Sequence, residues 1–262
     1  MQKPNFLDQE FLLNSLLDPF CDENYCKVEY TFINCSSYPE KIKKALEAEI
    51  KESSKSSFLD IGAGPALLTR SIGKAYEKST VVEPNPKYES SYQNLGVEYF
   101  LDTFERVRLE DKYDFIFCSH MLYHVPQLEW PIVINKMDKL RKKGGRIAVT
   151  LVADHGPWYS FKKRFNKLTV HAGLLKNVLD NLNISYKTIP VTSSVRTRNP
   201  IQLKELVNVF AIGDNITPQM YASMTFEEKI NLDQQLESII EECKVRKNYY
   251  ELVMEDECLV IS

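Results

Sequence analysis

The chain has 262 residues, of which 44% are hydrophobic and 26% are charged, as is usual for a globular protein with one large α/β domain. Its 33 basic and 36 acidic residues give a net charge of −3. This charge argues against nucleic acid as a partner, because proteins that bind a phosphate backbone concentrate positive charge. No apolar stretch reaches the roughly 20 residues that cross a bilayer, and Asp8, Glu10 and Asp18 argue against a signal peptide. We therefore expect a cytoplasmic, monomeric protein that binds neither nucleic acid nor membranes.

The six cysteines show neither a C-x-x-C pair nor the dense spacing of a disulfide framework. Cys21 and Cys26 lie close in sequence, but they lack His and Cys partners at the spacing of metal ligands. We therefore expect reduced thiols and no metal site.

Residues 1–56 are expected to form a helical cap that contributes to a substrate pocket. Within them, Ile42, Leu46 and Ile50 recur at helical spacing with charged residues between them, which predicts an amphipathic helix over 38–54. Pro39 suits the first turn of this helix, and a run of serines ends it.

A regular alternation of short apolar runs and helical patterns follows the cap. The predicted strands are 58–61, 80–83, 97–100, 113–117 and 146–151, and the predicted helices are 65–77, 86–95, 103–109 and 126–142. Two later strands are expected at 186–191 and 258–261. This rhythm predicts a parallel α/β sheet with helices on both faces, built from residues 57–191 and 257–262.

Residues 192–256 interrupt the sheet before its last strand. Helical patterns cover 202–210 and 226–247, and a segment of this length is too long for a structureless loop in a compact domain. We expect a helical insertion that walls or covers a substrate pocket, and a purely structural embellishment is the alternative.

The strand predicted at 58–61 runs into two glycines, Gly62 and Gly64. Glycine lets the backbone approach a ligand closely, and nucleotide-like ligands of open α/β sheets lie beyond the carboxyl ends of the strands. Glu83 closes the next strand, where its carboxylate can accept hydrogen bonds from both hydroxyls of a ribose. A solvated acid at the strand end is the alternative interpretation of Glu83.

The third glycine of a dinucleotide-binding loop is replaced by Leu67. S-adenosylmethionine carries no phosphate, so this replacement favours it over a nicotinamide dinucleotide as the cofactor. Asp102, just past the third strand, could accept a hydrogen bond from the adenine amino group, although a helix cap at Asp102 or Thr103 explains the pattern nearly as well.

The fourth strand ends in a segment that contains His120 and His124. Polar side chains at this strand end project over the same crevice as the glycine loop. For His120 this position favours a functional role, whereas His124 is equally well explained as a packing residue. His155 and His171 have no comparable placement.

Several motifs together resemble one family of enzymes. The motifs are Asp60–Gly64, Val81–Pro84, Tyr113–Ile116, Met121–Tyr123, Trp158 with Phe161–Lys163, and Leu179–Leu182, and the closing Leu259–Ile261 also fits. Their order and spacing, from about residue 34 to 190, are similar to those of the histamine N-methyltransferase family. The resemblance implies a Rossmann-like class I methyltransferase sheet with a helical insertion before the last strand, and S-adenosylmethionine as the methyl donor.

The resemblance also implies which residues form the site. Cofactor contacts are implied at Gly62, Gly64, Glu83, Tyr88, Asp102, Thr103 and Ser119. The candidate substrate contacts are Tyr38, His120, His124, Trp158 and Glu255. The family's pocket glutamate falls at Tyr38, its glutamine falls at His120, and its terminal asparagine has only the acidic run 255–257 as a counterpart. The resemblance therefore does not extend to histamine itself.

We interpret the chain as an S-adenosylmethionine-dependent methyltransferase that acts on a small molecule, in the first place on the nitrogen of a small amine. His120 is the candidate catalytic residue, since a neutral imidazole can accept the proton of an ammonium group or orient the nucleophile. The acids around Glu255 could attract a cationic substrate. The alternatives are an oxygen or carboxyl methyltransferase, a nicotinamide oxidoreductase, and an inactive protein that keeps the fold as a binding module.

Overall fold

The computed structural model describes residues 22–165, 169–213, 216 and 218–262. The chain divides into two compact units. One comprises Ser37–Tyr159, Val170–Ser193 and Val253–Ser262, and the other comprises the described parts of Met1–Ser36, Ser160–Thr169 and Ser194–Leu252.

The chain forms a mixed sheet, most of which belongs to the first unit. Its strands are β1 Ser57–Ile61, β2 Lys78–Val82, β3 Glu98–Phe100, β4 Tyr113–Ser119, β5 Arg141–Val152, β6 Tyr186–Thr197, β7 Lys244–Arg246 and β8 Tyr249–Ile261. Of these, β7, the end of β6 and the start of β8 belong to the second unit. Their order is β3-β2-β1-β4-β5-β8-β6, with β7 paired to β8. The first five strands pair in parallel and β8 is antiparallel to β5. This topology confirms the predicted Rossmann-like α/β fold.

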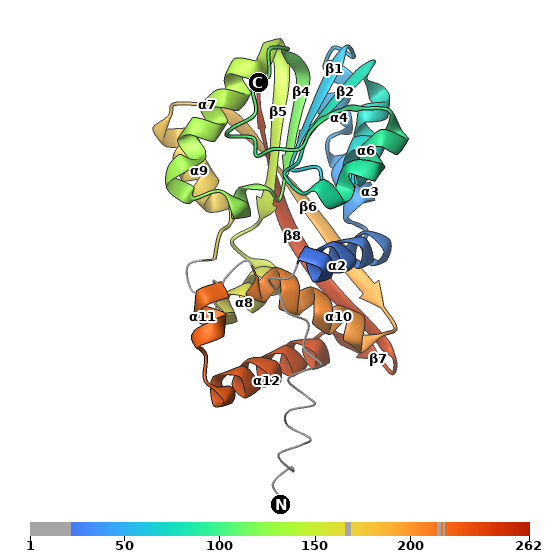
Figure 1. Ribbon diagram of the computed structural model, residues 1–262, viewed down its shortest axis with the longest axis vertical. Helices are drawn as coiled ribbons and strands as arrows, with labels where there is room; N and C mark the ends of the chain where they lie inside the picture. Colours follow the sequence, from blue (N-terminus) through green and yellow to red (C-terminus); the bar gives the residue numbers. More distant parts are fainter. Residues whose placement is uncertain (1–21, 166–168, 214–215, 217) are drawn as a thin grey trace, which may run out of the picture. The chain divides into compact units, whose positions relative to one another are not determined.

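Helices cover both faces of the parallel part of the sheet. They are α3 Tyr38–Ala45, α4 Glu47–Glu52, α5 Leu67–Ile72, α6 Glu89–Leu95, α7 Trp130–Leu140 and α9 Ala172–Asn181, with short 3-10 turns η1 Gly73–Ala75, η2 Pro86–Tyr88, η3 Leu122–His124 and η4 Gln127–Glu129. Helices α7 and α9 lie together on one side of the sheet, and α3 and α6 lie on the other (Figure 1). Because both faces are covered, β1 and β4 are almost wholly buried and are mostly apolar, with the buried acids Asp60 and Asp114 as exceptions.

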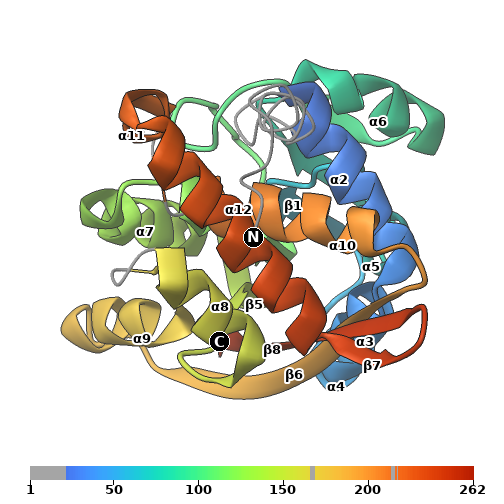
Figure 2. The same cartoon turned by 90° about the horizontal axis from the view of Figure 1, so that it is seen from below.

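The second unit is mainly helical. It contains α2 Asp22–Cys35, α10 Pro200–Val207, a π-helical turn η5 Asn208–Ile212, α11 Pro218–Ser223 and α12 Phe226–Glu242, and α8 Gly156–Phe165 passes from one unit into the other. Helix α10 packs against α2 and α12 (Figure 2). Arg164 binds Glu242 through two hydrogen bonds of 2.8 and 2.7 Å, and the Thr225 hydroxyl caps α12 together with Glu228. None of the helices in the described ranges combines the length and the hydropathy needed to cross a bilayer.

Three predicted helices are shorter or absent. Residues 103–109 form a single turn, in which the amides of Arg106 and Val107 both donate to the Thr103 carbonyl. That one turn is enough to bury the side chains of Phe104 and Val107, so their spacing in the sequence does not require a helix. The helix expected over 38–54 is divided at Leu46, and the one expected over 226–247 ends at Glu242.

The last strand is much longer than the predicted 258–261. It begins at Tyr249, and its buried positions alternate with partly exposed ones through Leu252, Met254, Asp256 and Cys258. Residues 249–256 were expected within the insertion without an element of their own, whereas their period of two is that of a strand with one face in the core. Strand β5 likewise begins earlier than predicted, at Arg141, and passes through a register irregularity opposite β4.

Candidate active site

The carboxyl ends of β1, β2 and β4 lie next to one another. Ile61 at the end of β1 is paired with both Val82 of β2 and Cys118 of β4. The next residue of each strand therefore lies at one edge of the sheet, where open α/β sheets bind their ligands. These residues are Gly62, Glu83 and Ser119.

The loop after β1 is held in a conformation that requires glycine. Gly62 has a φ of +70° and Gly64 a φ of +50°, which is the left-handed region. The Gly62 amide donates to the Val82 carbonyl at 2.8 Å, and the Tyr92 hydroxyl donates to the Gly64 carbonyl at 2.6 Å. A Cβ atom at Gly62 would lie 2.6 Å from the Cβ of Met121, so the loop also lies tightly against the segment that follows β4.

Glu83 fastens this loop to the end of β2. Its Oε2 accepts a hydrogen bond from the Gly64 amide at 3.1 Å, and its Oε1 accepts one from the Asn85 amide at 2.9 Å. The side chain is largely buried, and burial raises the pKa of Glu83. Each carboxylate oxygen has two lone pairs, so both can accept a further hydrogen bond from a ribose hydroxyl.

The donor set of this loop fits S-adenosylmethionine better than a dinucleotide. A pyrophosphate needs backbone amides and the amino end of a helix. The Gly64 amide is engaged by the Glu83 carboxylate, and α5 begins only at Leu67. A phosphate placed at this loop would face the negative charge of Glu83, whereas the ribose and sulfonium of S-adenosylmethionine would not be repelled by it.

Asp60 is a second buried acid at this end of β1. It is 2% exposed, and the Thr69 hydroxyl donates to its Oδ2 at 2.6 Å. Burial, together with a smaller effect of the nearby charge of Glu83, raises the pKa of Asp60 to about 7. The folded protein therefore holds a proton on Asp60 at pH values where the unfolded chain has lost it.

This proton predicts how stability depends on pH. Because the pKa of Asp60 is about 7 in the folded protein and 3.8 as the ordinary value, the free energy of unfolding should fall as pH rises from about 4 to about 7. Asp60→Asn should remove this slope and raise the free energy of unfolding at pH 8 by about 2 kcal/mol, since loss of the buried charge outweighs the cost of burying an amide. Urea unfolding across this range measures the effect. The exposed Glu110→Gln is the control, and an unchanged slope in Asp60→Asn would contradict the assignment.

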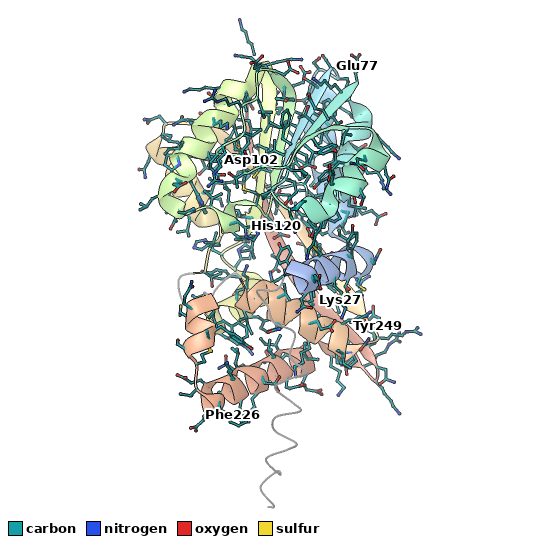
Figure 3. The ribbon with its side chains drawn as sticks, viewed as in Figure 1. Lys27, Glu77, Asp102, His120, Phe226 and Tyr249 are labelled. Carbon is teal, nitrogen blue, oxygen red and sulfur yellow. The ribbon has the colours of Figure 1, made fainter. Side chains whose placement is uncertain are left out.

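Of the other candidates, Asp102 and Tyr88 are expected to contact the cofactor, and His124 is expected to contact the acceptor. Asp102 (labelled in Figure 3) accepts a hydrogen bond from the Thr103 amide at 2.8 Å, so it caps the turn that begins at Thr103. Tyr88 is buried at the end of η2. His124 is exposed at the end of η3, and its charge lowers the pKa of Glu83 against the effect of burial.

His120 follows β4 in an uncommon backbone conformation. Its φ is +55°, and its amide donates to the Thr150 carbonyl of β5 at 3.0 Å (Figure 3 labels His120). The ring of Tyr38, from α3, lies 5.0 Å from the His120 ring, and the Tyr38 hydroxyl shares a 2.7 Å hydrogen bond with Ser119. Burial raises the pKa of Tyr38 well above its usual value, and the charge of Asp256 adds to this.

Two further side chains contact the His120 ring. The Tyr123 hydroxyl lies 3.3 Å from Nδ1 and also accepts a hydrogen bond from the Val152 amide at 2.8 Å. On the other side, Asp256 Oδ1 lies 3.8 Å from Nε2. The Asp256 side chain is fully buried, whereas that of His120 is 26% exposed. A partly accessible imidazole is therefore held between a phenol and a buried carboxylate.

The structure brings Tyr38 and Ser119 to His120. Two further acceptor candidates, Glu255 and Trp158, belong to the same unit. Glu255 packs against the backbone of Gly156, and Trp158 is buried in the first turns of α8. Among the described residues, no group of three or more His, Cys, Asp or Glu side chains is arranged to hold a metal ion.

Sequence reasoning did not select Tyr123 or Asp256. Asp256 could have been found, because the residues at 252, 254, 258 and 260 are apolar and one acid interrupts this alternation. No comparable pattern marks Tyr123, whose role depends on the turn that carries it back to Val152.

Comparison with known proteins gave one family and several similar folds. A family described as "Methyltransferase domain" matches residues 34–182, and no curated protein matches. A candidate methyltransferase from Bacillus halodurans C-125 is 12% identical, with 85% of this chain and 98% of that chain covered and a TM-score of 0.56. The YcgJ protein of Bacillus subtilis is 15% identical, with coverages of 84% and 98% and a TM-score of 0.55. A candidate sarcosine dimethylglycine methyltransferase from Galdieria sulphuraria is 18% identical, with coverages of 85% and 84% and a TM-score of 0.50. At these identities the likeness is one of fold.

Proposed function

The chain belongs to the methyltransferase-domain family and is an S-adenosylmethionine-dependent enzyme, and from this premise we propose that it methylates the nitrogen of a small amine. The observation that carries the proposal is the partly exposed imidazole of His120, which stands beside Ser119 with the buried carboxylate of Asp256 3.8 Å behind it. A negative charge at this place favours a cationic acceptor over a neutral or anionic one.

The resemblance to the histamine N-methyltransferase family supports the same class of substrate. Tyr38 and His120 stand where that family has its pocket glutamate and glutamine, so the amine we propose is not histamine itself. Tyr38 and His120 contact each other in this chain through their rings. They form a more aromatic and less hydrogen-bonding surface than a glutamate and a glutamine would, which suits an amine with an apolar body.

Each candidate residue has a part in this proposal. Gly62, Gly64, Glu83, Tyr88, Asp102, Thr103 and Ser119 would hold the cofactor. Tyr38, His120, His124, Trp158 and Glu255 would hold the acceptor. Residues 57–191 and 257–262 would form the cofactor-binding core, and residues 1–56 and 192–256 would supply the acceptor side.

The chemistry requires a nitrogen with an available lone pair. The cofactor supplies a methyl group on a sulfonium, which a neutral amine can attack directly, whereas most aliphatic amines carry a proton at pH 7. A neutral imidazole can accept such a proton, so His120 is the candidate base. Its charged form would then be stabilised by Asp256.

The proposal is tested by binding and turnover measured separately. The purified protein is titrated with S-adenosylmethionine, with NADH as the control ligand, and then assayed with matched panels of small amines, alcohols and carboxylates. We expect micromolar binding of S-adenosylmethionine alone and methyl transfer to amines. Transfer to the alcohols or carboxylates only would show an oxygen methyltransferase, and binding without any turnover would show a protein that keeps the fold without the reaction.

His120→Ala should reduce kcat with an amine about a hundredfold, because general base catalysis contributes on the order of 10² or more. The dissociation constant for S-adenosylmethionine should change by less than about twofold, since His120 is proposed to face the acceptor and not the cofactor. The matched control is His155→Ala, whose ring is exposed and bonded to Asp154. Unchanged turnover in His120→Ala would remove His120 from the reaction.

A further inference from the structure

Tyr123, His120 and Asp256 lie in a row that is anchored at both ends to one residue of β5. The Val152 amide donates to the Tyr123 hydroxyl at 2.8 Å. Val152 is also the residue paired with Asp256 in the antiparallel register of β5 and β8. The strand pairing thus fixes the phenol and the carboxylate on either side of the His120 ring.

The hydrogen bonds indicate which proton each group holds. The Tyr123 oxygen accepts from the Val152 amide, so its own hydrogen can point toward Nδ1 of His120 at 3.3 Å. In a neutral imidazole one nitrogen accepts and the other carries the hydrogen. With Nδ1 as the acceptor, the N–H of Nε2 faces Asp256 Oδ1 at 3.8 Å.

The buried carboxylate favours a positive charge on the ring. Asp256 is 1% exposed, and its neighbours on the same face of β8 are the buried Met254 and Cys258. A carboxylate in such surroundings is costly unless a partner of opposite charge or a donor is close. Among the described contacts, the titratable groups against the His120 ring are Asp256 on β8, Tyr38 on α3 and Tyr123 on η3. Of these three groups, Asp256 has the carboxyl group, whose ionised form attracts an imidazolium.

We propose that Tyr123, His120 and Asp256 form a proton relay that deprotonates the acceptor amine. Tyr123 would touch the acceptor, His120 would receive the proton, and Asp256 would be a positioning residue that acts through His120. This inference rests on the proposed amine methyltransferase function. The left-handed backbone of His120, with its φ of +55°, is consistent with a side chain held in place for such a purpose.

The proposed step conserves protons and electrons. A proton of the acceptor ammonium passes to the Tyr123 oxygen while the Tyr123 proton passes to Nδ1, which leaves an imidazolium facing the Asp256 carboxylate. The freed lone pair on nitrogen forms the new N–C bond as the C–S bond of the sulfonium breaks, and the electron pair of that bond remains on sulfur. The imidazolium then returns its proton to water through Tyr123.

The first experiment needs no substrate, so its outcome is independent of the proposed function. The ring signals of His120 are followed against pH by ¹⁵N NMR of histidine-labelled protein, with His120→Gln used to assign them. In Asp256→Asn the titration midpoint of His120 should move to lower pH, because the imidazolium loses its counter-charge. Glu257→Gln is the matched control, since the neighbouring Glu257 binds Lys176 instead. An unmoved midpoint in Asp256→Asn overturns the relay.

The second experiment measures the reaction. Asp256→Asn and Tyr123→Phe should each lower kcat with an amine by about tenfold or more while the dissociation constant for S-adenosylmethionine stays within about twofold. The acid limb of the pH–rate profile should move to lower pH in Asp256→Asn. Asp256→Glu keeps the charge and should restore part of the rate, which separates a lost charge from a misfolded strand. Full activity in Tyr123→Phe overturns the relay. If the wild-type protein methylates none of the amines, the proposed function is overturned, even if the titration midpoint of His120 moves as expected.

Discussion

Replacing Gly62 with alanine is expected to abolish S-adenosylmethionine binding and to lower the free energy of unfolding by about 3 kcal/mol. Two separate costs add up to this value. The φ of +70° strains any residue with a Cβ atom, and that Cβ would lie 2.6 Å from the Cβ and Cγ of Met121. Since Met121 follows directly on His120, relief of the clash would displace both the glycine loop and the candidate catalytic segment. Thermal and urea unfolding together with calorimetric titration measure the two effects.

Gly96→Ala is the matched control for this substitution. Gly96 has a similar φ of +66°, but no atom lies within 4 Å of where its Cβ would be. It should therefore show only the conformational cost, about 1 kcal/mol, and bind S-adenosylmethionine normally. Equal destabilisation in the two variants would mean that the contact with Met121 has no energetic role, and normal binding by Gly62→Ala would remove this loop from the cofactor site.

The parallel half of the sheet was predictable because each strand is short, apolar and followed by a turn residue. The run Phe58–Ile61 before Gly62 is the clearest case, and β1 occupies Ser57–Ile61. Such strands are buried on both faces, so their hydrophobicity does not depend on which residues lie opposite. The same property explains why the order of elements indicated the fold before any contact was known.

The antiparallel strands were less predictable because their patterns depend on what each face meets. Strand β8 carries Glu251, Glu255 and Glu257 on one face, while the other face is apolar except for Asp256. In sequence this alternation follows a few residues after α12, and the glutamates on its outer face hide the apolar period that would indicate a strand. The pairing with β5 makes this segment a strand, since residues 147–152 align with residues 256–261.

The residues of the candidate site likewise divide into those that the sequence predicts and those that depend on strand pairing. Gly62, Glu83 and Ser119 were predictable because the ends of parallel strands meet at one edge. Asp256 was not chosen, although its neighbour Glu255 was, because two adjacent strand residues point to opposite faces and only the register shows which one faces the site. The contact of Asp256 with His120 joins segments more than a hundred residues apart, and no local pattern reports such a pairing.

Glu83 is the residue through which the glycine loop and the cofactor are proposed to be coupled. Its two oxygens hold the amides of Gly64 and Asn85, and each oxygen has a second lone pair with which we propose that it accepts from a ribose hydroxyl. Removal of the carboxylate therefore has two consequences. The cofactor loses two charge-assisted hydrogen bonds, and the amides that the carboxylate held must find other acceptors.

Glu83→Ala should accordingly weaken S-adenosylmethionine binding about a thousandfold, since each hydrogen bond to a charged group contributes about 1.5–3 kcal/mol. Glu83→Gln should fall between the wild type and Glu83→Ala, because its amide group can accept through one oxygen but turns a donor toward either the Gly64 or the Asn85 amide. Calorimetric titration of both variants gives the order of affinities, and Glu77→Gln, an exposed acid just before β2 and far from Gly64, is the control. If Glu83→Gln bound S-adenosylmethionine as tightly as the wild type, the carboxylate would hold the backbone amides of the loop without contacting the cofactor. The cofactor ribose would then have to be held by other groups at this edge of the sheet.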